Sequence, residues 1–245
     1  MNHNLRFAHI AGAVLLACLL PSYGQKKSGV DGDFRVLGTR LASKEIIKDK
    51  PYSADGVTEI TQTLSDGNKL SRKLTSRWYR SGDGRLRLEQ NISVLGIWTA
   101  SGSETRRISV FDPSSGSGFT LDPDHMRVES YSIKKKAAEP ASSAGDKTES
   151  LGTRVLEGLT AQGTRKTEII PAGDLGNTLP IEIVDESWYS PDLQVVLMTK
   201  HHDPRTGNIV YRLTHIDRSE PPASLFQVPP GYSAEGAGPK SKNKR

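Results

Sequence analysis

The chain of 245 residues contains a single cysteine, Cys18, which lies in an apolar run near the N-terminus. The rest of the chain has no partner for a disulfide, even in a compartment where disulfides form. We therefore expect packing and sheet hydrogen bonds alone to stabilise the fold.

Sequence patterns of the common catalytic chemistries are also missing. There is no G-x-S-x-G turn for a nucleophilic serine and no Gly-rich phosphate loop that leads into a helix. Asp185 and Glu186 are neighbours in a predicted strand, so their carboxylates point to opposite faces. The same holds for the imidazoles of His201 and His202, so we interpret His201, His202 and Asp203 as a polar turn rather than a metal site. We therefore predict no catalytic residues, no metal and no cofactor, and a protein that is not an enzyme.

Long hydrophobic runs are absent as well. The longest covers residues 10–20 (IAGAVLLACLL), which is too short to cross a hydrocarbon core roughly 30 Å thick. Arg6 precedes it, Pro21 ends it, and Ser22 and Gly24 are the small residues of a cleavage site. We predict a signal peptide over residues 1–24, no transmembrane segment, and a periplasmic or secreted protein. Because LLAC resembles a lipobox, a lipid anchor on Cys18 is the alternative.

The composition is that of a soluble globular protein, with 35% hydrophobic and 25% charged residues. We expect a lead-in segment over residues 25–50, one domain over residues 51–233 and a basic disordered tail over residues 234–245. Residues 134–150 contain almost no large apolar side chain, which predicts a flexible loop within the domain.

Apolar and polar residues alternate from residue 57 onward, which is the pattern of half-buried strands. A three-residue loop over residues 66–68 would pair Leu64 with Leu70, and a loop that ends in Gly84 would pair Trp78 with Leu88. About ten to eleven short strands follow from the turn signals. The predicted fold is mainly β: a single curved antiparallel sheet that forms an open half-barrel, with few short helices.

The predicted meander of residues 58–92 has two different faces. The apolar face is either core or, in an open barrel, the lining of a cavity for an acyl chain; it consists of Leu70, Leu74, Trp78, Leu86, Leu88 and Ile92. The cationic face is either a solvated surface or an electrostatic docking face; it consists of Lys69, Lys73, Arg77, Arg85 and Arg87. For an exported protein, such a face would meet anionic lipids, cell-wall polymers or acidic proteins rather than nucleic acid.

Residues 181–232 give the densest packing signal: three strands joined by turns and closed by a helical turn over residues 223–226. Trp188, Tyr189, Phe226 and Tyr232 are expected to close the sheet. The segments 61–70, 78–90, 151–177 and 188–232 resemble an uncharacterised family of exported bacterial proteins of acidobacterial type. The order of D-P-x-T-G-x (residues 203–208) and L-F-x-V-P-x-x-Y (residues 225–232) is similar to that in the periplasmic lipoprotein-carrier (LolA/LolB-like) superfamily and related sigma-factor regulators.

The second resemblance implies a half-barrel with a hydrophobic concave face and a helical plug, although no plug helices are evident and the loop 134–150 has no counterpart. We therefore predict a non-catalytic envelope protein that binds a lipid, or the lipid of a lipoprotein, in an apolar concavity. The alternative is a sensor or protein-interaction domain whose basic strand face docks an acidic envelope partner or a membrane surface.

Overall fold

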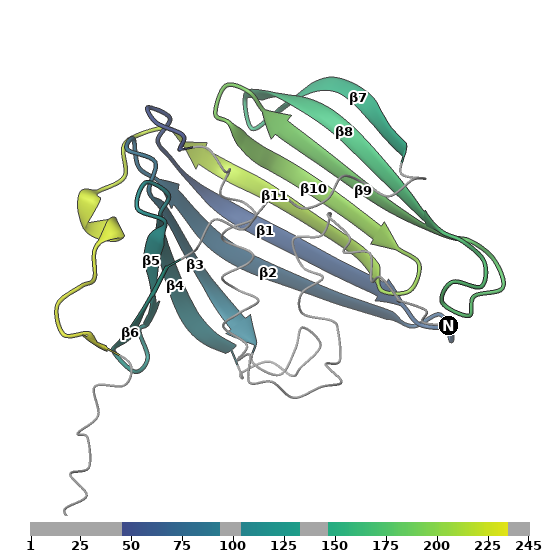
Figure 1. Ribbon diagram of the computed structural model, residues 1–245, viewed down its shortest axis with the longest axis horizontal. Helices are drawn as coiled ribbons and strands as arrows, with labels where there is room; N and C mark the ends of the chain where they lie inside the picture. Colours follow the sequence, from purple (N-terminus) through teal and green to yellow (C-terminus); the bar gives the residue numbers. More distant parts are fainter. Residues whose placement is uncertain (1–45, 94–103, 133–146, 235–245) are drawn as a thin grey trace, which may run out of the picture. The chain divides into compact units, whose positions relative to one another are not determined.

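The structure is a computed structural model and describes residues 46–93, 104–132 and 147–234. Within these ranges the chain forms twelve strands and a short 3-10 helix, η2, and the strands belong to one sheet (Figure 1). The strand order is β12-β6-β5-β4-β3-β2-β1-β11-β10-β9-β8-β7. The end strands β12 and β7 do not pair with each other, so the sheet is open. This confirms the predicted mainly β class with a single, mostly antiparallel sheet.

The elements have the following bounds: β1 Tyr52–Thr63, β2 Lys69–Arg80, β3 Leu86–Ser93, β4 Glu104–Asp112, β5 Ser117–Asp122, β6 Arg127–Ser132, β7 Lys147–Leu156, β8 Leu159–Ile170, β9 Ile181–Ser190, β10 Val195–Asp203, β11 Gly207–Asp217, η2 Ala223–Phe226 and β12 Ser233–Ala234. The predicted helical turn over residues 223–226 is confirmed as η2. The predicted signal peptide with Cys18, most of the lead-in segment, residues 134–146 of the predicted loop and most of the basic tail lie outside the described residues. Within the described ranges, no helix is long and apolar enough to cross a membrane.

The described residues group into two compact units. The first unit holds residues 59–71 and 147–212, which include β7, β8, β9 and β10. The second unit holds residues 46–58, 72–93, 104–132 and 213–234, which include β3, β4, β5, β6, η2 and β12. Strands β1, β2 and β11 contribute residues to both units.

In the second unit, the hairpin of β2 and β3 has the predicted register. Trp78 pairs with Leu88 and Arg77 with Glu89. Gly84 has a φ of 95° at the last loop position, and its N–H donates to the Ser81 carbonyl at 2.9 Å. A residue with a Cβ would be strained in that left-handed conformation, so glycine determines the loop length and thereby the register.

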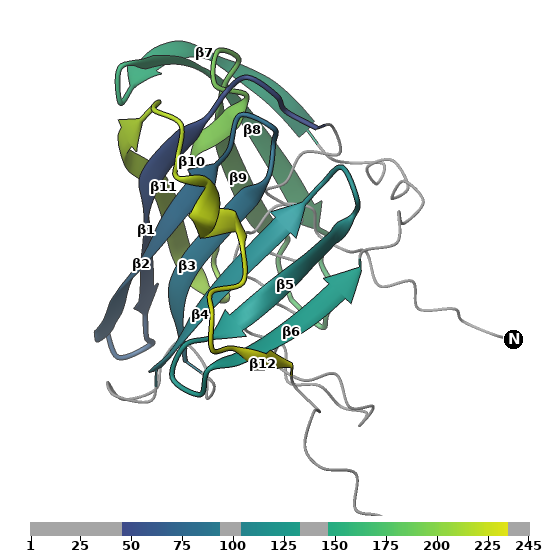
Figure 2. The same cartoon turned by 90° about the vertical axis from the view of Figure 1, so that its left-hand side faces the viewer.

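The C-terminal segment of the second unit returns to the sheet after β11. Figure 2 shows the yellow segment with η2 beside β3, ending as β12 next to β6. Phe226 is buried, and the Arg87 side chain donates to the Leu225 carbonyl at 2.6 Å. Ser233 and Ala234 pair in parallel with Arg127 and Val128. The closure role predicted for Phe226 agrees with this packing.

In the first unit, the turn between β1 and β2 differs by one residue from the prediction. Gly67 N–H donates to the Leu64 carbonyl, and Leu64 N–H donates to the Asn68 carbonyl, so the loop is 65–67 rather than 66–68. The predicted pair of Leu64 with Leu70 is therefore wrong. The reason is that Gly67, with a φ of 84°, takes the left-handed last loop position. Because the loop still has three residues, the even-numbered residues of both strands share a face, as predicted.

The hairpin of β7 and β8 turns at Glu157 and Gly158, as predicted, and Leu156 pairs with Leu159. Residues 147–150 were expected in the flexible loop but form the start of β7. Their polar side chains are held across the strands, because Arg165 bridges Glu149 at 2.9 Å and Glu186 at 2.6 Å. Polar composition indicated a loop here, whereas cross-strand ion pairs permit a strand.

Each unit has its own buried residues. In the first unit they include Ile60, Ile183, Leu197, Ile209 and Tyr211, and in the second Tyr52, Ala54, Trp78, Leu88, Ile108, Val110, Leu121 and Phe226. Burial raises the pKa of Tyr52 to about 12, although the Arg80 guanidinium, 4.8 Å from its ring centre, acts in the opposite direction. Arg80 is itself buried and donates to the Lys50 carbonyl at 2.8 Å.

Candidate functional site

The predicted apolar face is partly buried and partly accessible. In the second unit Trp78 and Leu88 lie opposite each other and are 5% and 3% exposed. Leu74, Leu86 and Ile92 in the same unit are half-buried, so part of each side chain is accessible. Leu70 belongs to the first unit and is also half-buried.

A polar spot interrupts this apolar face, and we call Gly56, Ser76, Trp78 and Gln90 the polar notch. A Cβ on Gly56 would collide with Ser76 Oγ and lie 3.0 Å from Trp78 Nε1, so the glycine makes room for both side chains. Ser76 Oγ donates weakly to the Gly56 carbonyl at 3.5 Å. Ser76 also pairs with Gln90 on β3, one cross-strand row from Trp78 and Leu88. The four residues therefore lie together on one face.

Two hydrogen-bond donors of the polar notch have no acceptor. Trp78 Nε1 and Gln90 Nε2 are buried and have no hydrogen-bond partner. Leaving a buried donor unsatisfied costs about 1–3 kcal/mol. Nearly all buried polar groups in folded proteins have a hydrogen-bond partner, so two unsatisfied donors on one apolar face are unusual. The notch can donate two hydrogen bonds to an acceptor from outside the described residues.

The predicted docking face is largely engaged within the second unit. Arg77 Nη1 lies 2.7 Å from Asp55 Oδ1, and His215 Nδ1 lies 3.0 Å from Asp55 Oδ2. The hydrogen bond from Arg77 holds the pKa of Asp55 below its ordinary value, and His215 adds to this effect. Arg85 pairs with Asp83 at 2.9 Å and lies over the Phe226 ring.

Arg87 is the most strongly engaged of the five predicted docking residues. Its side chain is 8% exposed, bonds to Glu89 at 2.8 Å and donates to the Leu225 carbonyl. Lys69 and Lys73 are exposed. The structure therefore leaves two exposed lysines of the five residues, with Lys69 in the first unit and Lys73 in the second.

A shallow cleft of about 450 Å³ lies beside Lys73 and Arg77 of the predicted docking face, in the second unit. It is lined by Asp55, Val57, Lys73, Thr75, Ser76, Arg77, Glu89, Gln90, Asn91, Arg106, Thr214 and His215. Arg106 pairs with Glu89 at 3.0 Å. The Asp55–Arg77 and Glu89–Arg106 pairs leave little unbalanced charge for a ligand.

The histidine pair points to opposite sides of β10, as the sequence predicts. The predicted polar turn is wrong, however, because His201, His202 and Asp203 are the last residues of β10 and the turn follows them. His201 Nδ1 lies 2.7 Å from Asp185 Oδ1, whereas His202 Nδ1 lies 2.7 Å from Asn208 Oδ1. In the described part of the chain, no three His, Cys, Asp or Glu side chains come together in a group that could hold a metal ion. Asp203 is fully buried and bonds with Arg205.

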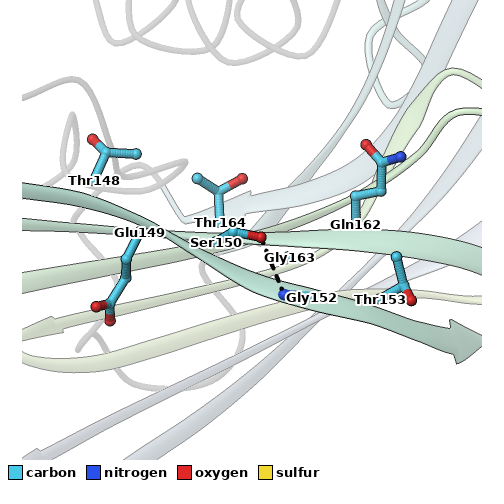
Figure 3. Close-up of a pocket in the computed structure, with 8 residues that line it drawn as sticks. All are labelled: Thr148, Glu149, Ser150, Gly152, Thr153, Gln162, Gly163 and Thr164. Carbon is cyan, nitrogen blue, oxygen red and sulfur yellow. Dashed lines mark hydrogen bonds between the residues drawn. The ribbon is translucent and has the colours of Figure 1, made fainter.

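A second pocket, of about 480 Å³, lies on the hairpin of β7 and β8 (Figure 3). A β-bulge between Ser150 and Gly152 shifts the register there, and Gly152 N–H donates to Ser150 Oγ at 3.2 Å. Hydroxyl and amide groups dominate its lining, which consists of Thr148, Glu149, Ser150, Gly152, Thr153, Gln162, Gly163 and Thr164. Sequence reasoning missed this site, because its residues were assigned to a flexible loop or to ordinary strand positions.

The comparisons with known proteins give a fold-level likeness. No family model matches the chain, and no curated protein matches it. Similar solved structures include an uncharacterised conserved protein from Thermus thermophilus, with 10% identity and a TM-score of 0.44 over 82% of this chain and 97% of that one. MucB, which has also been solved in a complex with MucA from Pseudomonas aeruginosa, has 14% identity and a TM-score of 0.42 over 81% of this chain and 64% of that one.

A LolA superfamily protein from Nitrosomonas europaea has 9% identity and a TM-score of 0.34 over 77% of this chain and 96% of that one. Because all these TM-scores are below 0.5, the likenesses carry no argument about function. Membership of the acidobacterial-type family stays a prediction.

Proposed function

We propose that this protein is a non-catalytic protein of the bacterial envelope that binds a lipid or acyl group on the apolar face of β2 and β3. The observation that carries the proposal is the pair of buried, unpartnered donors on that face, Trp78 Nε1 and Gln90 Nε2. A protein tolerates such donors when another molecule supplies the acceptor.

The chemistry of the face matches an acyl ester or a fatty acid. The accessible parts of Leu74, Leu86 and Ile92 would be covered by the hydrocarbon chain, at roughly 25 cal/mol per Å² of apolar surface removed from water. The ester carbonyl or carboxylate would accept hydrogen bonds from Trp78 and Gln90. A pure hydrocarbon would leave both donors unsatisfied, so the face favours a ligand that has a hydrocarbon chain and an oxygen acceptor.

Native mass spectrometry of the protein purified from its own envelope tests this proposal. The expected result is a mass increment that organic solvent removes and that is identified as an acyl lipid. Trp78→Phe combined with Gln90→Leu keeps an apolar face but removes both donors, and should lower the fraction of lipid-bound protein. Thr75→Val, at an exposed position of the same strand, is the matched control. A clean apo mass for the wild-type protein would refute the proposal.

The rival function is docking of an acidic partner, and the exposure of Lys73 beside the shallow cleft favours it. Its test is association with the envelope fraction. Lys73→Glu should reduce that association if the docking function is real. Unchanged association would make the basic face a solvated surface.

A further inference from the structure

Arg154 on β7 takes part in an unusual cluster in the first unit. Its guanidinium carbon lies 3.7 Å from the centre of the Trp188 ring. Its Nη2 donates to Met198 Sδ at 3.2 Å, and a thioether is a weak acceptor. The three side chains come from β7, β9 and β10. Stacking on an indole holds the guanidinium in place without neutralising it.

Glycine at position 163 of β8 permits this arrangement. Gly163 pairs with Trp188, and a Cβ on it would lie 2.7 Å from the far edge of the indole. The ring therefore lies over β8 and reaches towards β7, where Arg154 pairs with Ala161. The tight turn at Glu157 and Gly158 sets the register of Arg154 on β8, because the pairing is unbroken from Leu156 back to Gly152.

Arg154 differs from the other arginines of the first unit in having no acidic partner. Arg165 bridges two glutamates, Arg205 pairs with Asp203 at 2.6 Å, and Arg212 pairs with Glu59 at 2.7 Å. Among the described residues, no carboxylate lies within ion-pair distance of Arg154, and this side chain is half-buried. A half-buried guanidinium without a counter-charge is costly, because burial removes part of its hydration.

Two donors of the cluster also lack acceptors. Arg154 Nε and Trp188 Nε1 are both buried and have no hydrogen-bond partner. A guanidinium with an unused Nε–H, stacked on an indole whose N–H is also unused, has the composition of an oxyanion site, because guanidinium donors match the oxygens of phosphate and carboxylate groups.

We propose that Arg154 and Trp188 form a binding site for a small oxyanion of the phosphate class. The site belongs to the first unit and does not depend on the acyl-binding face of the second unit. Free phosphate and the phosphate of a lipid head group share the chemistry that the site recognises, and the experiment separates these two sources.

Titration of the full chain with inorganic phosphate tests the site, with the indole N–H resonances of the three tryptophans as the readout. Trp188→Phe assigns the relevant resonance. The expected result is a saturable shift of the Trp188 resonance that sodium chloride at equal ionic strength does not reproduce. Arg154→Gln should weaken phosphate binding roughly tenfold or more, as expected for loss of a charged hydrogen-bond donor. An identical response to chloride, or equal affinity in Arg154→Gln, overturns the proposal.

Matched variants keep the test informative. Arg212→Gln removes an arginine that already has a carboxylate partner, and should leave the affinity for phosphate unchanged. Arg154→Lys keeps the positive charge but loses the planar guanidinium donors, and it replaces Arg154→Gln in the test if that variant fails to fold. The affinity of Arg154→Lys for phosphate should fall several-fold. If Arg212→Gln weakens binding as much as the Arg154 variants, the effect is one of net charge and the site is refuted.

Vesicles distinguish the two sources of the phosphate group. Binding to phosphatidylglycerol vesicles that requires Arg154, without a response to inorganic phosphate, supports the site and assigns it to a lipid head group. A response to inorganic phosphate supports the site for free phosphate. Absence of any Arg154-dependent response in both arms overturns it. Lipid retention in the Trp78→Phe, Gln90→Leu variant is measured separately, so failure of either proposal is distinguishable from failure of the other.

Discussion

His201 and Asp185 face each other across β10 and β9, with His201 Nδ1 2.7 Å from Asp185 Oδ1. An ionised carboxylate only accepts hydrogen bonds, so Nδ1 is the donor in this contact. His201 is 4% exposed, and its Nε2 is buried without a partner. The pair therefore contains one satisfied and one unsatisfied buried nitrogen.

This asymmetry predicts different costs for the two halves of the pair. Asp185→Ala leaves the buried Nδ1–H without an acceptor and should reduce the free energy of unfolding by about 1–3 kcal/mol. His201→Leu removes both nitrogens but leaves the Asp185 carboxylate, which is only 15% exposed, without this hydrogen-bond donor, so it should cost more, about 3–5 kcal/mol. Urea denaturation of both variants measures the difference. A smaller loss in His201→Leu than in Asp185→Ala would contradict this interpretation.

Charge reversal separates folding from docking on β2 and β3. Arg87→Glu places two like charges beside each other and breaks a bond to Leu225, so the free energy of unfolding should fall by about 3–5 kcal/mol. Lys73→Glu changes an exposed side chain and should stay within about 0.5 kcal/mol of wild type. Thermal or chemical denaturation checks both values. Equal stability of the two variants would show that Arg87 is not structurally engaged.

Gly163→Ala should disturb the Trp188 ring. The added methyl group would lie 2.7 Å from the indole and 2.8 Å from Leu151 Cβ, so the ring or the strand must move. Overpacking of this kind costs about 1–3 kcal/mol. Urea denaturation gives the loss of stability, and the indole resonance of Trp188 reports the displacement. An unchanged resonance together with wild-type stability would refute the contact.

The lowered pKa of Asp203 predicts that its contribution to the free energy of unfolding is lost in acid. Burial alone would raise its pKa, but hydrogen bonds from the side chain and backbone of Arg205 outweigh this, and the pKa is lowered. A carboxyl group with a lowered pKa in the folded state stabilises the protein above the pKa of the unfolded state, near about 3.9, and loses that contribution as the pH falls through the folded value. The stability gap between wild type and Asp203→Asn should therefore be constant above about pH 5 and shrink below about pH 4. A gap that grows on acidification would contradict this sign.

Local sequence signals predicted the features that depend on short-range geometry. Gly84 determined the register of β2 and β3, and Gly158 the hairpin of β7 and β8. The turn before β2 was displaced by one residue, because the SDGN sequence offers two placements of a three-residue loop and only the backbone shows that Gly67 takes the left-handed position.

The site features were harder to predict, because they depend on residues far apart in the chain. Alternation placed Arg87 on the cationic face, predicted to be either a solvated surface or a docking face, but the Leu225 carbonyl of the C-terminal segment accepts a hydrogen bond from its side chain. Trp188 was assigned to sheet closure, and nothing local indicates that Arg154, across a bulged hairpin, stacks on it. The unpartnered donors of Trp78 and Gln90 follow from the absence of acceptors in the folded neighbourhood, which no pattern in one strand reveals.

The parallel pairing of β12 with β6 has a consequence for synthesis of the chain. Ser233 pairs with Arg127, which precedes it by most of the length of the domain, so the outer edge of β6 stays open while the ribosome adds the rest of the chain. An open strand edge is a template for pairing with a neighbouring nascent chain. In truncated chains that lack residues 233 and 234, the outer edge of β6 would stay unpaired. Pairing of β12 therefore protects that edge from association with other molecules.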